Sequence, residues 1–278
     1  MKIDDQIEVK KIVKKSGSSF FWGMNVLDPE RKRAMFSIYA FCRIVDDIAD
    51  EIKNKRLKIE KLKSWKKKIN NIFESKKLKS SIEKELKIAV EKFQLERLDF
   101  YAIIDGMMMD AKSDIKFPKK KNLELYCDRV AVAVGYLSIR IFGLSEKEKK
   151  YAFYLGRAFQ LTNIVRDFYE DLKRGRCYVA SEYLSIYGVK KDIKTIKHDP
   201  KLQNILQDIL HEANIFFEKS NIEAKKISKK QIIASEIMKT FYKAIHTKMF
   251  KKKIDIEKKI KLNYFQKIYI LVLFAVRY

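Results

Sequence analysis

Two segments of this sequence place acidic side chains at helical spacing within otherwise apolar surroundings. In the first, MFSIYAFCRIVDDIAD at residues 35–50, Asp46 and Asp50 lie four residues apart. Tyr39 and Arg43 precede them at spacings that continue the same helical face. A helix that is apolar on its other sides carries such a stripe when the stripe faces a wet cavity or an ion, or when Arg43 forms internal ion pairs with the aspartates.

The second segment, LGRAFQLTNIVRDFYEDLKRGRCYVA at residues 155–180, carries a matching polar stripe. Its members are Gln160, Asn163, Asp167 and Asp171, at spacings of three, four and four residues. Two carboxylate stripes that face each other repel unless cations lie between them. Oxygen ligands with one amide, and with neither histidine nor cysteine, favour a hard cation, and Mg²⁺ is the natural choice.

The basic residues near these stripes indicate what the cations would act on. Several lie close in sequence to the carboxylates: Arg43, Arg166, Lys173, Arg174 and Arg176. Mg²⁺ ions flanked by such side chains suit a diphosphate, because they bridge its oxygens and neutralise the charge that develops as it leaves. The histidines, His198, His211 and His246, are scattered and match no metal-binding spacing. We therefore interpret them as ordinary surface or core residues.

The 278-residue chain has a formal net charge of +25, which suggests an anionic partner such as a nucleic acid, a membrane surface or a phosphorylated substrate. Lysine supplies most of this charge, whereas sites for nucleic acids favour arginine. We therefore attribute most of the charge to solvated helix faces and lysine-rich codon usage, and the rest to an anionic surface partner. Three cysteines are too few for a disulfide framework and predict a reducing compartment.

Apolar residues recur every three or four positions along most of the chain, which predicts helices. The helical segments are 30–52, 55–75, 80–112, 121–142, 146–172, 200–225 and 231–250. Eight glycines and three prolines are too few for the turns of an all-β fold. Because no strand pattern, flexible linker or internal repeat interrupts the chain, we predict one all-α domain over residues 1–278.

The two ends of the chain bear on its location. The most apolar run, residues 268–276, is too short to span a bilayer. The favoured interpretation of this run is a buried C-terminal helix, and the alternative is an end of the protein that touches a membrane. The N-terminus lacks the apolar core of a secretory signal, so we expect a cytoplasmic protein.

Small residues near the second stripe leave two alternatives open. Ala131 and Gly135 share one helical face, and Gly156 begins another helix. These residues allow helices to pack closely, or they leave a channel for a long apolar chain. The aromatic residues that would line such a channel include Phe20, Phe21, Trp22 and Tyr126.

Three segments together resemble the squalene/phytoene synthase family: SGSSFFWGM…YAFCRIVDDIAD, YCDRVAVAVGYLSIRIFG and LGRAFQLTNIVRDFYEDLKRGRCYV. The resemblance runs from about residue 12 to about residue 270, and the middle segment is most similar to the bacterial branch that makes presqualene diphosphate for hopanoids. It implies an all-α prenyl-synthase bundle around a central cavity. It also implies a Mg²⁺-dependent, head-to-head condensation of two farnesyl diphosphates to presqualene diphosphate and diphosphate.

The resemblance further implies roles for individual residues. Asp46 and Asp50 would hold metal on one wall of the cavity. Asn163 and Asp167 would hold it on the other, Asp171 would complete the second motif, and two or three Mg²⁺ ions would bind. Tyr126 would lie near the reacting carbons. The diphosphates would be contacted by Ser16, Gly17, Ser18, Ser19, Tyr39, Arg43, Gln160, Arg166 and Tyr242.

Two positions depart from the family pattern. Ala180 stands where relatives often have proline, and Lys259 stands where a related synthase has arginine. Lysine keeps the positive charge of arginine but loses its bidentate fork. Both departures concern substrate positioning rather than the class of reaction.

Other functions fit parts of the sequence less well. The same fold could make phytoene or dehydrosqualene, because cavity length decides between C15 and C20 substrates. A non-catalytic assembly or scaffold relative should have lost carboxylates, whereas both stripes are complete here. A nucleic-acid-binding helical protein would leave the aspartate stripes unexplained, so we expect no nucleic-acid partner.

Two further expectations concern NADPH and the membrane. No G-x-G-x-x-G motif follows a strand, and we expect no NADPH requirement. A lysine-rich surface is attracted to anionic lipid, so the protein is expected to bind peripherally at the inner face of the membrane.

Overall fold

Helices form nearly all the regular structure in the computed structural model of this protein, which describes every residue except 1–2, 114, 252–253, 255–256, 258 and 278. Within those described residues no β-strand forms, and one isolated bridge joins Lys116 to Cys177. The prediction of an all-α fold is therefore confirmed.

The N-terminal helices carry the first acidic stripe. They are α1 (Ile3–Lys15), α2 (Phe20–Met24), α3 (Pro29–Glu51), α4 (Lys55–Phe73), α5 (Ser81–Phe93) and α6 (Arg97–Ser113). Helix α3 begins sharply because Pro29 occupies its first turn and the Asp28 side chain accepts hydrogen bonds from two backbone N–H groups. The expected helix over residues 80–112 is two helices, because Gln94 ends α5 in a left-handed conformation with φ of 50°.

The remaining helices carry the second stripe and the C-terminus. They are α7 (Lys120–Cys127), α8 (Ala133–Ile141), α9 (Lys149–Arg166), α10 (Phe168–Lys173), α11 (Ser181–Tyr187), α12 (Leu202–Ala224), α13 (Lys229–Phe250) and α14 (Tyr264–Arg277). A π-helical turn, Asp128–Val132, joins α7 to α8 and overlaps the YCDRVA motif. Short 3₁₀ turns lie at Glu146–Glu148 and Ile196–His198. The expected helix over residues 146–172 breaks at Asp167, which lies between α9 and α10.

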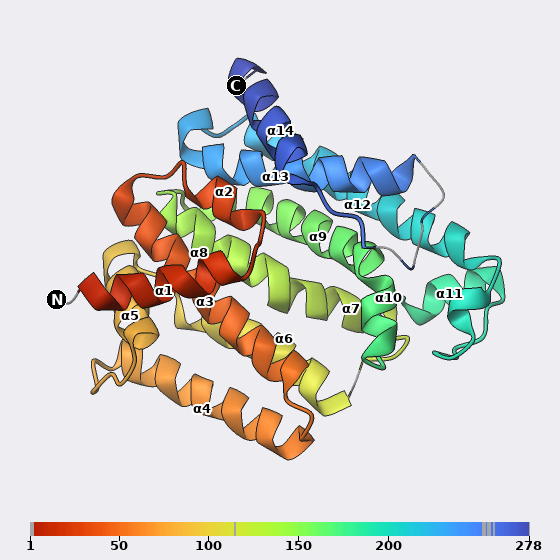
Figure 1. Ribbon diagram of the computed structural model, residues 1–278, viewed down its shortest axis with the longest axis horizontal. Helices are drawn as coiled ribbons and strands as arrows, with labels where there is room; N and C mark the ends of the chain where they lie inside the picture. The colour runs from red at the N-terminus through yellow and green to blue at the C-terminus, as the bar shows by residue number, and fades with distance from the viewer. Residues whose placement is uncertain (1–2, 114, 252–253, 255–256, 258, 278) are drawn as a thin grey trace.

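Two groups of buried apolar side chains hold these helices together. The first lies mainly among α1 and α3 to α6, where the Phe41 ring meets those of Trp65 and Phe100 at centroid distances of 5.5 and 5.4 Å. The second lies mainly among α9 to α13 and includes Tyr151 and Phe217. In Figure 1, α3, α6, α8 and α9 run side by side through the middle of the molecule, with α12 and α13 beyond α9.

Glycines allow α9 to approach the neighbouring π-helical turn and α8 closely. A Cβ atom at Gly156 would lie 3.0 Å from the Cα atom of Val132, and one at Gly135 would lie 3.2 Å from the Cβ and carbonyl O atoms of Ala152. Both glycines also line an apolar cavity. Both interpretations of the small residues are therefore correct, because the helices pack closely and the same residues border the apolar cavity.

Helix α14 contradicts the interpretation of a buried C-terminal helix. None of its described side chains is buried. Ile270, Leu271 and Phe274 pack against the second core group, whereas the opposite side of the helix faces outward because no other described element covers it. Among the described residues, no helix is both long enough and apolar enough to cross a membrane.

Candidate active site

A cavity between α3, α9 and the π-helical turn has a polar part and an apolar part. The polar part has a volume of about 510 Å³, and the apolar part has a volume of about 240 Å³. The two parts adjoin, because Phe20, Tyr39 and Asn163 line both of them. The cavity thus joins a charged compartment to an apolar one.

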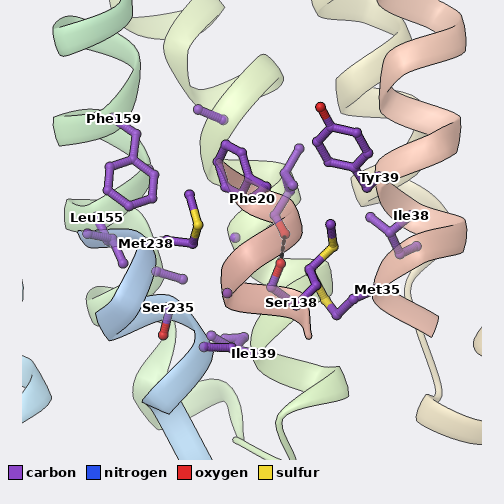
Figure 2. A pocket seen from close by; sticks show the side chains of 18 of the residues that line it. Phe20, Met35, Ile38, Tyr39, Ser138, Ile139, Leu155, Phe159, Ser235 and Met238 are labelled. Atoms are coloured by element: carbon purple, nitrogen blue, oxygen red, sulfur yellow. Dashed lines mark hydrogen bonds between the residues drawn. The ribbon is translucent and has the colours of Figure 1, made fainter. Parts of the chain in front are cut away.

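The apolar part is enclosed by side chains from α2, α3, α8, α9 and α13 (Figure 2). At its boundary with the polar part, the Phe20 ring lies 6.1 Å from the rings of Tyr39 and Phe159 and 5.8 Å from that of Tyr242, between centroids. Phe159 and Tyr242 stack at 4.1 Å. A charged compartment that leads past aromatic rings into an apolar space suits a ligand with an anionic head and a hydrocarbon chain.

Helix α3 presents its stripe to the polar part of the cavity, as its spacing predicted. Tyr39, Arg43, Asp46 and Asp50 all line this part. Arg43 forms ion pairs with Asp46, at 3.4 Å, and with Asp47. The alternative of an internal ion pair is therefore partly correct, although the same side chains face the cavity.

Asp50 is held from the opposite wall. Arg174 Nη1 lies 2.9 Å from Asp50 Oδ2, and Arg176 Nη1 donates to Asp50 Oδ1 at 2.6 Å. Arg176 Nη2 also donates to the backbone carbonyl of Ala49 at 2.9 Å. Gly175, with φ of +76°, makes the turn between the two arginines. The R-G-R segment therefore joins the two walls through Asp50.

The second wall carries Gln160, Asn163, Asp167 and Asp171, all of which line the polar part. Arg166 donates two hydrogen bonds to Asp167, at 2.9 and 2.6 Å, and Lys259 lies 2.9 Å from the same carboxylate. Burial alone would raise the pKa of Asp167, but these cations outweigh burial and hold the pKa below its usual value. Lys259 also reaches Glu170 at 2.6 Å.

Asp46 and Asp171 have fewer basic side chains beside them than Asp50 and Asp167 have. Burial, reinforced by the neighbouring Asp50, raises the pKa of Asp46 to about 7. Its side chain is 41% accessible because it faces the cavity, whose walls nonetheless desolvate the carboxylate. Burial, reinforced by Asp167, raises the pKa of Asp171 to about 8, and no described residue forms a hydrogen bond or ion pair with its side chain. A cation between the walls would stabilise both carboxylates in their charged form.

Tyr126 lies at the polar part of the cavity in a buried cluster that was not predicted. Its hydroxyl donates to Asp110 Oδ2 at 3.0 Å, and the Tyr178 hydroxyl donates to Asp110 Oδ1 at 2.7 Å. The two rings stack at a centroid distance of 4.9 Å. Burial raises the pKa of Asp110 to about 6 and raises that of Tyr126 well above its usual value. Tyr126 is thus fixed in place and neutral.

The loop before α2 was predicted to contact diphosphates, and two of its serines reach the site. Ser18 lines the polar part, and Ser16 Oγ accepts a hydrogen bond from the Tyr39 hydroxyl at 3.0 Å. Gly17, with φ of +61°, makes the turn between them. Gly17 and Ser19 line neither part of the cavity.

The other predicted diphosphate contacts lie on α9 and α13. Gln160 lines both parts of the cavity, and Arg166 lines the polar part. Tyr242 lines the apolar part, and its ring lies 6.0 Å from the Arg166 guanidinium carbon. Tyr242 therefore lies in the apolar part close to the boundary with the polar part, next to Arg166.

The donor set of the polar part fits hard cations. Asn163 Oδ1 is buried and has no hydrogen-bond partner, which leaves an amide oxygen free to coordinate. No three of the described histidine, cysteine and acidic residues converge closely enough to surround an ion. A cation here would therefore take one or two protein oxygens from a wall and complete its shell with water or substrate oxygens.

Comparison with known protein families decides the identity of the fold. The squalene/phytoene synthase family model matches residues 13–265. The chain belongs to the squalene/phytoene synthase family. Its YCDRVA segment and both aspartate motifs, which contribute residues to the polar part of the cavity, lie within the matched residues.

Individual relatives within this family differ in their similarity to the chain. A presqualene diphosphate synthase of Zymomonas mobilis is 41% identical over 84% of this chain and 80% of its own length. One of Sinorhizobium fredii is 40% identical over 82% of each chain. A chloroplastic phytoene synthase of Daucus carota is 31% identical over 73% of this chain and 52% of its own length.

Solved structures share the same fold. A dehydrosqualene synthase in complex with a ligand superposes with a TM-score of 0.85 at 24% identity, covering 99% of this chain and 98% of the other. The squalene synthase HpnC from Alicyclobacillus acidocaldarius superposes with a TM-score of 0.79 at 21% identity, covering 89% and 94%. The predicted prenyl-synthase architecture is therefore confirmed at the level of the fold.

Sequence reasoning missed several residues that face the polar part. Asp110 and Tyr178 were not predicted as site residues, and Arg174, Arg176 and Lys259 were noted without a defined contact. The signal for Asp110 was present, because it is a carboxylate that follows three methionines in the segment GMMMDA at residues 106–111 and is 2% exposed. The partners of Asp50 gave no local signal.

Proposed function

We propose that this protein condenses two molecules of farnesyl diphosphate head to head, giving presqualene diphosphate and diphosphate. The observation that carries the proposal is the pair of acidic walls that face each other across a polar space leading directly into an apolar one. Relatives named presqualene diphosphate synthase, about 40% identical over most of their length, support this choice of reaction.

We infer that the walls hold two or three Mg²⁺ ions. Asp46 and Asp50 would ligate on the α3 side, and Asn163, Asp167 and Asp171 on the other. When bound, Mg²⁺ supplies the positive charge that stabilises a departing diphosphate. Asp50 and Asp167 already have cationic partners, so Asp46, Asp171 and the free oxygen of Asn163 are the most available ligands.

The protein's own cations would position the two diphosphates. Arg43 and Arg166 line the polar part, and Ser18 and Gln160 offer neutral hydrogen-bonding groups beside them. The apolar part would receive a farnesyl chain past the rings of Phe20 and Tyr39 and would exclude water from the reacting carbons. This arrangement would orient one allylic carbon towards the double bond of the second substrate.

The proposed condensation breaks one C–O bond and one C–H bond and forms two C–C bonds. The C1–O bond of the donor breaks and its electron pair leaves with diphosphate, giving a farnesyl cation. The C2=C3 double bond of the acceptor then attacks C1, which places the positive charge on the acceptor's C3. Loss of a proton from the former donor C1 closes the cyclopropane of presqualene diphosphate. The departing diphosphate and Tyr126 are the candidate bases.

The geometry around Tyr126 favours the diphosphate as the immediate base. The Tyr126 hydroxyl is neutral and already donates its proton to Asp110. It could accept a proton only as it passes its own to Asp110, whereas the departing diphosphate is an anion that accepts the proton directly. Tyr126 therefore serves chiefly to shape the polar end of the cavity.

A product assay tests the proposal. Purified protein is incubated with farnesyl diphosphate and Mg²⁺ in the absence of NADPH, and the products are identified by mass spectrometry. We expect presqualene diphosphate to accumulate. Parallel reactions with geranylgeranyl diphosphate test the C20 alternative, and formation of phytoene alone, with no product from farnesyl diphosphate, would contradict the proposal.

A further inference from the structure

The outer face of α14 is an unbroken apolar surface. Phe265, Tyr269, Val272 and Val276 recur at spacings of four, three and four residues, so they lie on one side of the helix. Phe265 is 79% exposed, Tyr269 is 65% exposed and Val276 is 80% exposed. Other exposed large apolar residues, such as Leu98, Ile186 and Ile222, lie on different helices. Among the described residues, α14 therefore carries more exposed large apolar side chains than any other helix.

Lysines lie near the N-terminal end of α14, and of these Lys261 is exposed whereas Lys248 and Lys267 are half-buried. Lys261 is exposed three residues before α14, Lys267 lies within its first turns, and Lys248 of α13 donates to Gln266 at 2.9 Å. The sequence contains no acidic residue after Glu257. An apolar helical face on a segment that carries an exposed lysine and no carboxylate is complementary to an anionic, apolar partner.

The position of α14 links it to the cavity. Tyr264 of α14 packs against Trp22 of α2 at a centroid distance of 5.7 Å, and α14 also packs on α13. Neighbouring residues of those two helices, among them Gly23 and Met238, line the apolar part of the cavity. Figure 1 shows α14 at the edge of the molecule, on the outer side of α13. The helix therefore rests on the elements that enclose the apolar space.

We propose that α14 docks on the surface of an anionic lipid bilayer and lies in the interface, with its apolar face among the outer parts of the acyl chains. The exposed Lys261 contacts lipid phosphates, which adds an electrostatic attraction to the burial of apolar area. The helix is too short to cross the bilayer. Given the proposed function, this orientation places the apolar cavity beside the membrane that receives the lipophilic product.

Co-sedimentation with vesicles tests this surface independently of catalysis. The probes are vesicles of phosphatidylglycerol and phosphatidylcholine, vesicles of phosphatidylcholine alone, and low-salt and high-salt buffers. The test variant is Phe265→Gln/Tyr269→Gln/Val272→Gln, since glutamine keeps helix propensity. The matched control, Leu98→Gln/Ile186→Gln/Ile222→Gln, removes as many exposed apolar residues elsewhere. A second variant, Lys261→Gln, isolates the charge contribution of the exposed lysine.

We expect the full chain and the matched control to bind anionic vesicles. The α14 triple variant should lose at least about tenfold in partitioning, and the lysine variant should lose less and become less sensitive to salt. Turnover in detergent solution should stay unchanged in all three variants. Equal binding by the α14 variant and the control would overturn the proposal, whatever the product assay gives. The proposal would also be overturned if the protein did not bind vesicles but formed dimers that the α14 substitutions dissociate. That result would make the α14 face a surface for self-association.

Discussion

The two acidic walls of the cavity lie on α3 and on α9–α10. In each wall one aspartate forms ion pairs with two basic side chains, and another aspartate has one long ion pair or none. On α3, Asp50 is paired and Asp46 has a single contact, with Arg43 at 3.4 Å. On the other wall, Asp167 is paired and no described residue pairs with Asp171. The walls differ in where the pairing cations originate.

That difference separates two jobs for acidic residues of the same type. The arginines that hold Asp50 come from the opposite wall, so this contact ties the walls together. Asp167 is held by its neighbour Arg166 and by Lys259 from the C-terminal segment, so this contact orients a side chain within one wall. The less compensated carboxylates, Asp46 and Asp171, remain as the groups most in need of a bound cation.

The largest expected effect falls on the less compensated pair. Asp46→Asn and Asp171→Asn each remove a proposed Mg²⁺ ligand, and turnover should fall by about 10³-fold or more, equivalent to about 4 kcal/mol of transition-state stabilisation. Because each substitution removes a carboxylate whose pKa burial has raised, thermal stability should not fall. Steady-state kinetics and thermal unfolding followed by circular dichroism measure the two effects. Near-wild-type rates in both variants would refute the assignment of these residues.

Asp50→Asn should lower activity and stability together. The substitution leaves the buried Arg176 guanidinium without its anionic partner, and we expect the free energy of unfolding to fall by about 1–3 kcal/mol. Turnover should also fall, because the walls lose their connection as well as a ligand. Chemical denaturation provides the measurement. If Asp50→Asn were as stable as Asp46→Asn, the distinction between paired and less compensated carboxylates would be wrong.

Lys259 tests the orientation of Asp167. Lys259→Ala removes one of its cationic partners, and kcat/KM should fall by about tenfold, whereas Lys259→Arg should retain most activity because it keeps the charge. The comparison uses the same kinetic assay, with Lys261→Ala as a control on the same segment. Equal losses for Lys259→Ala and Lys259→Arg would show that charge at this position is not what matters.

Asp110 gives the smallest expected effect and lies outside both stripes. Asp110→Asn weakens one of the hydrogen bonds from Tyr126 and Tyr178, a loss of about 1 kcal/mol that corresponds to about fivefold in rate. The Mg²⁺ concentration needed for half-maximal rate should not change. A large rise in that concentration would instead make Asp110 part of the metal site.

The features that the sequence predicted depend on local spacing. Residues four apart on a helix share a face whatever the rest of the chain does, so the α3 stripe was correctly assigned to one face. The second stripe was assigned correctly even though the helix breaks at Asp167, since the N–H groups of Asp167 and Asp171 still donate to the carbonyls four residues earlier and all four stripe residues line the polar part. Helix type was predictable for the same local reason.

The features that were missed depend on distant partners or on exceptions to periodicity. The contact between Asp50 and Arg176 joins residues 126 positions apart, and no local pattern predicts it. Helices α1, α2 and α11 were missed because they are short or lysine-rich. The apolar run of α14 predicted burial, but burial requires a covering element, and none of the described residues provides one on its outer side.

One diffraction experiment tests the central claim most directly. Crystals are grown with Mn²⁺ in place of Mg²⁺ and with a non-hydrolysable farnesyl thiodiphosphate, and the anomalous signal of manganese is mapped. We predict peaks bridging the thiodiphosphate to Asp46 on one wall and to Asn163 or Asp171 on the other, with the farnesyl chain in the apolar part of the cavity. A bound thiodiphosphate held only by arginines and lysines, with no metal peak between the walls, would contradict the account.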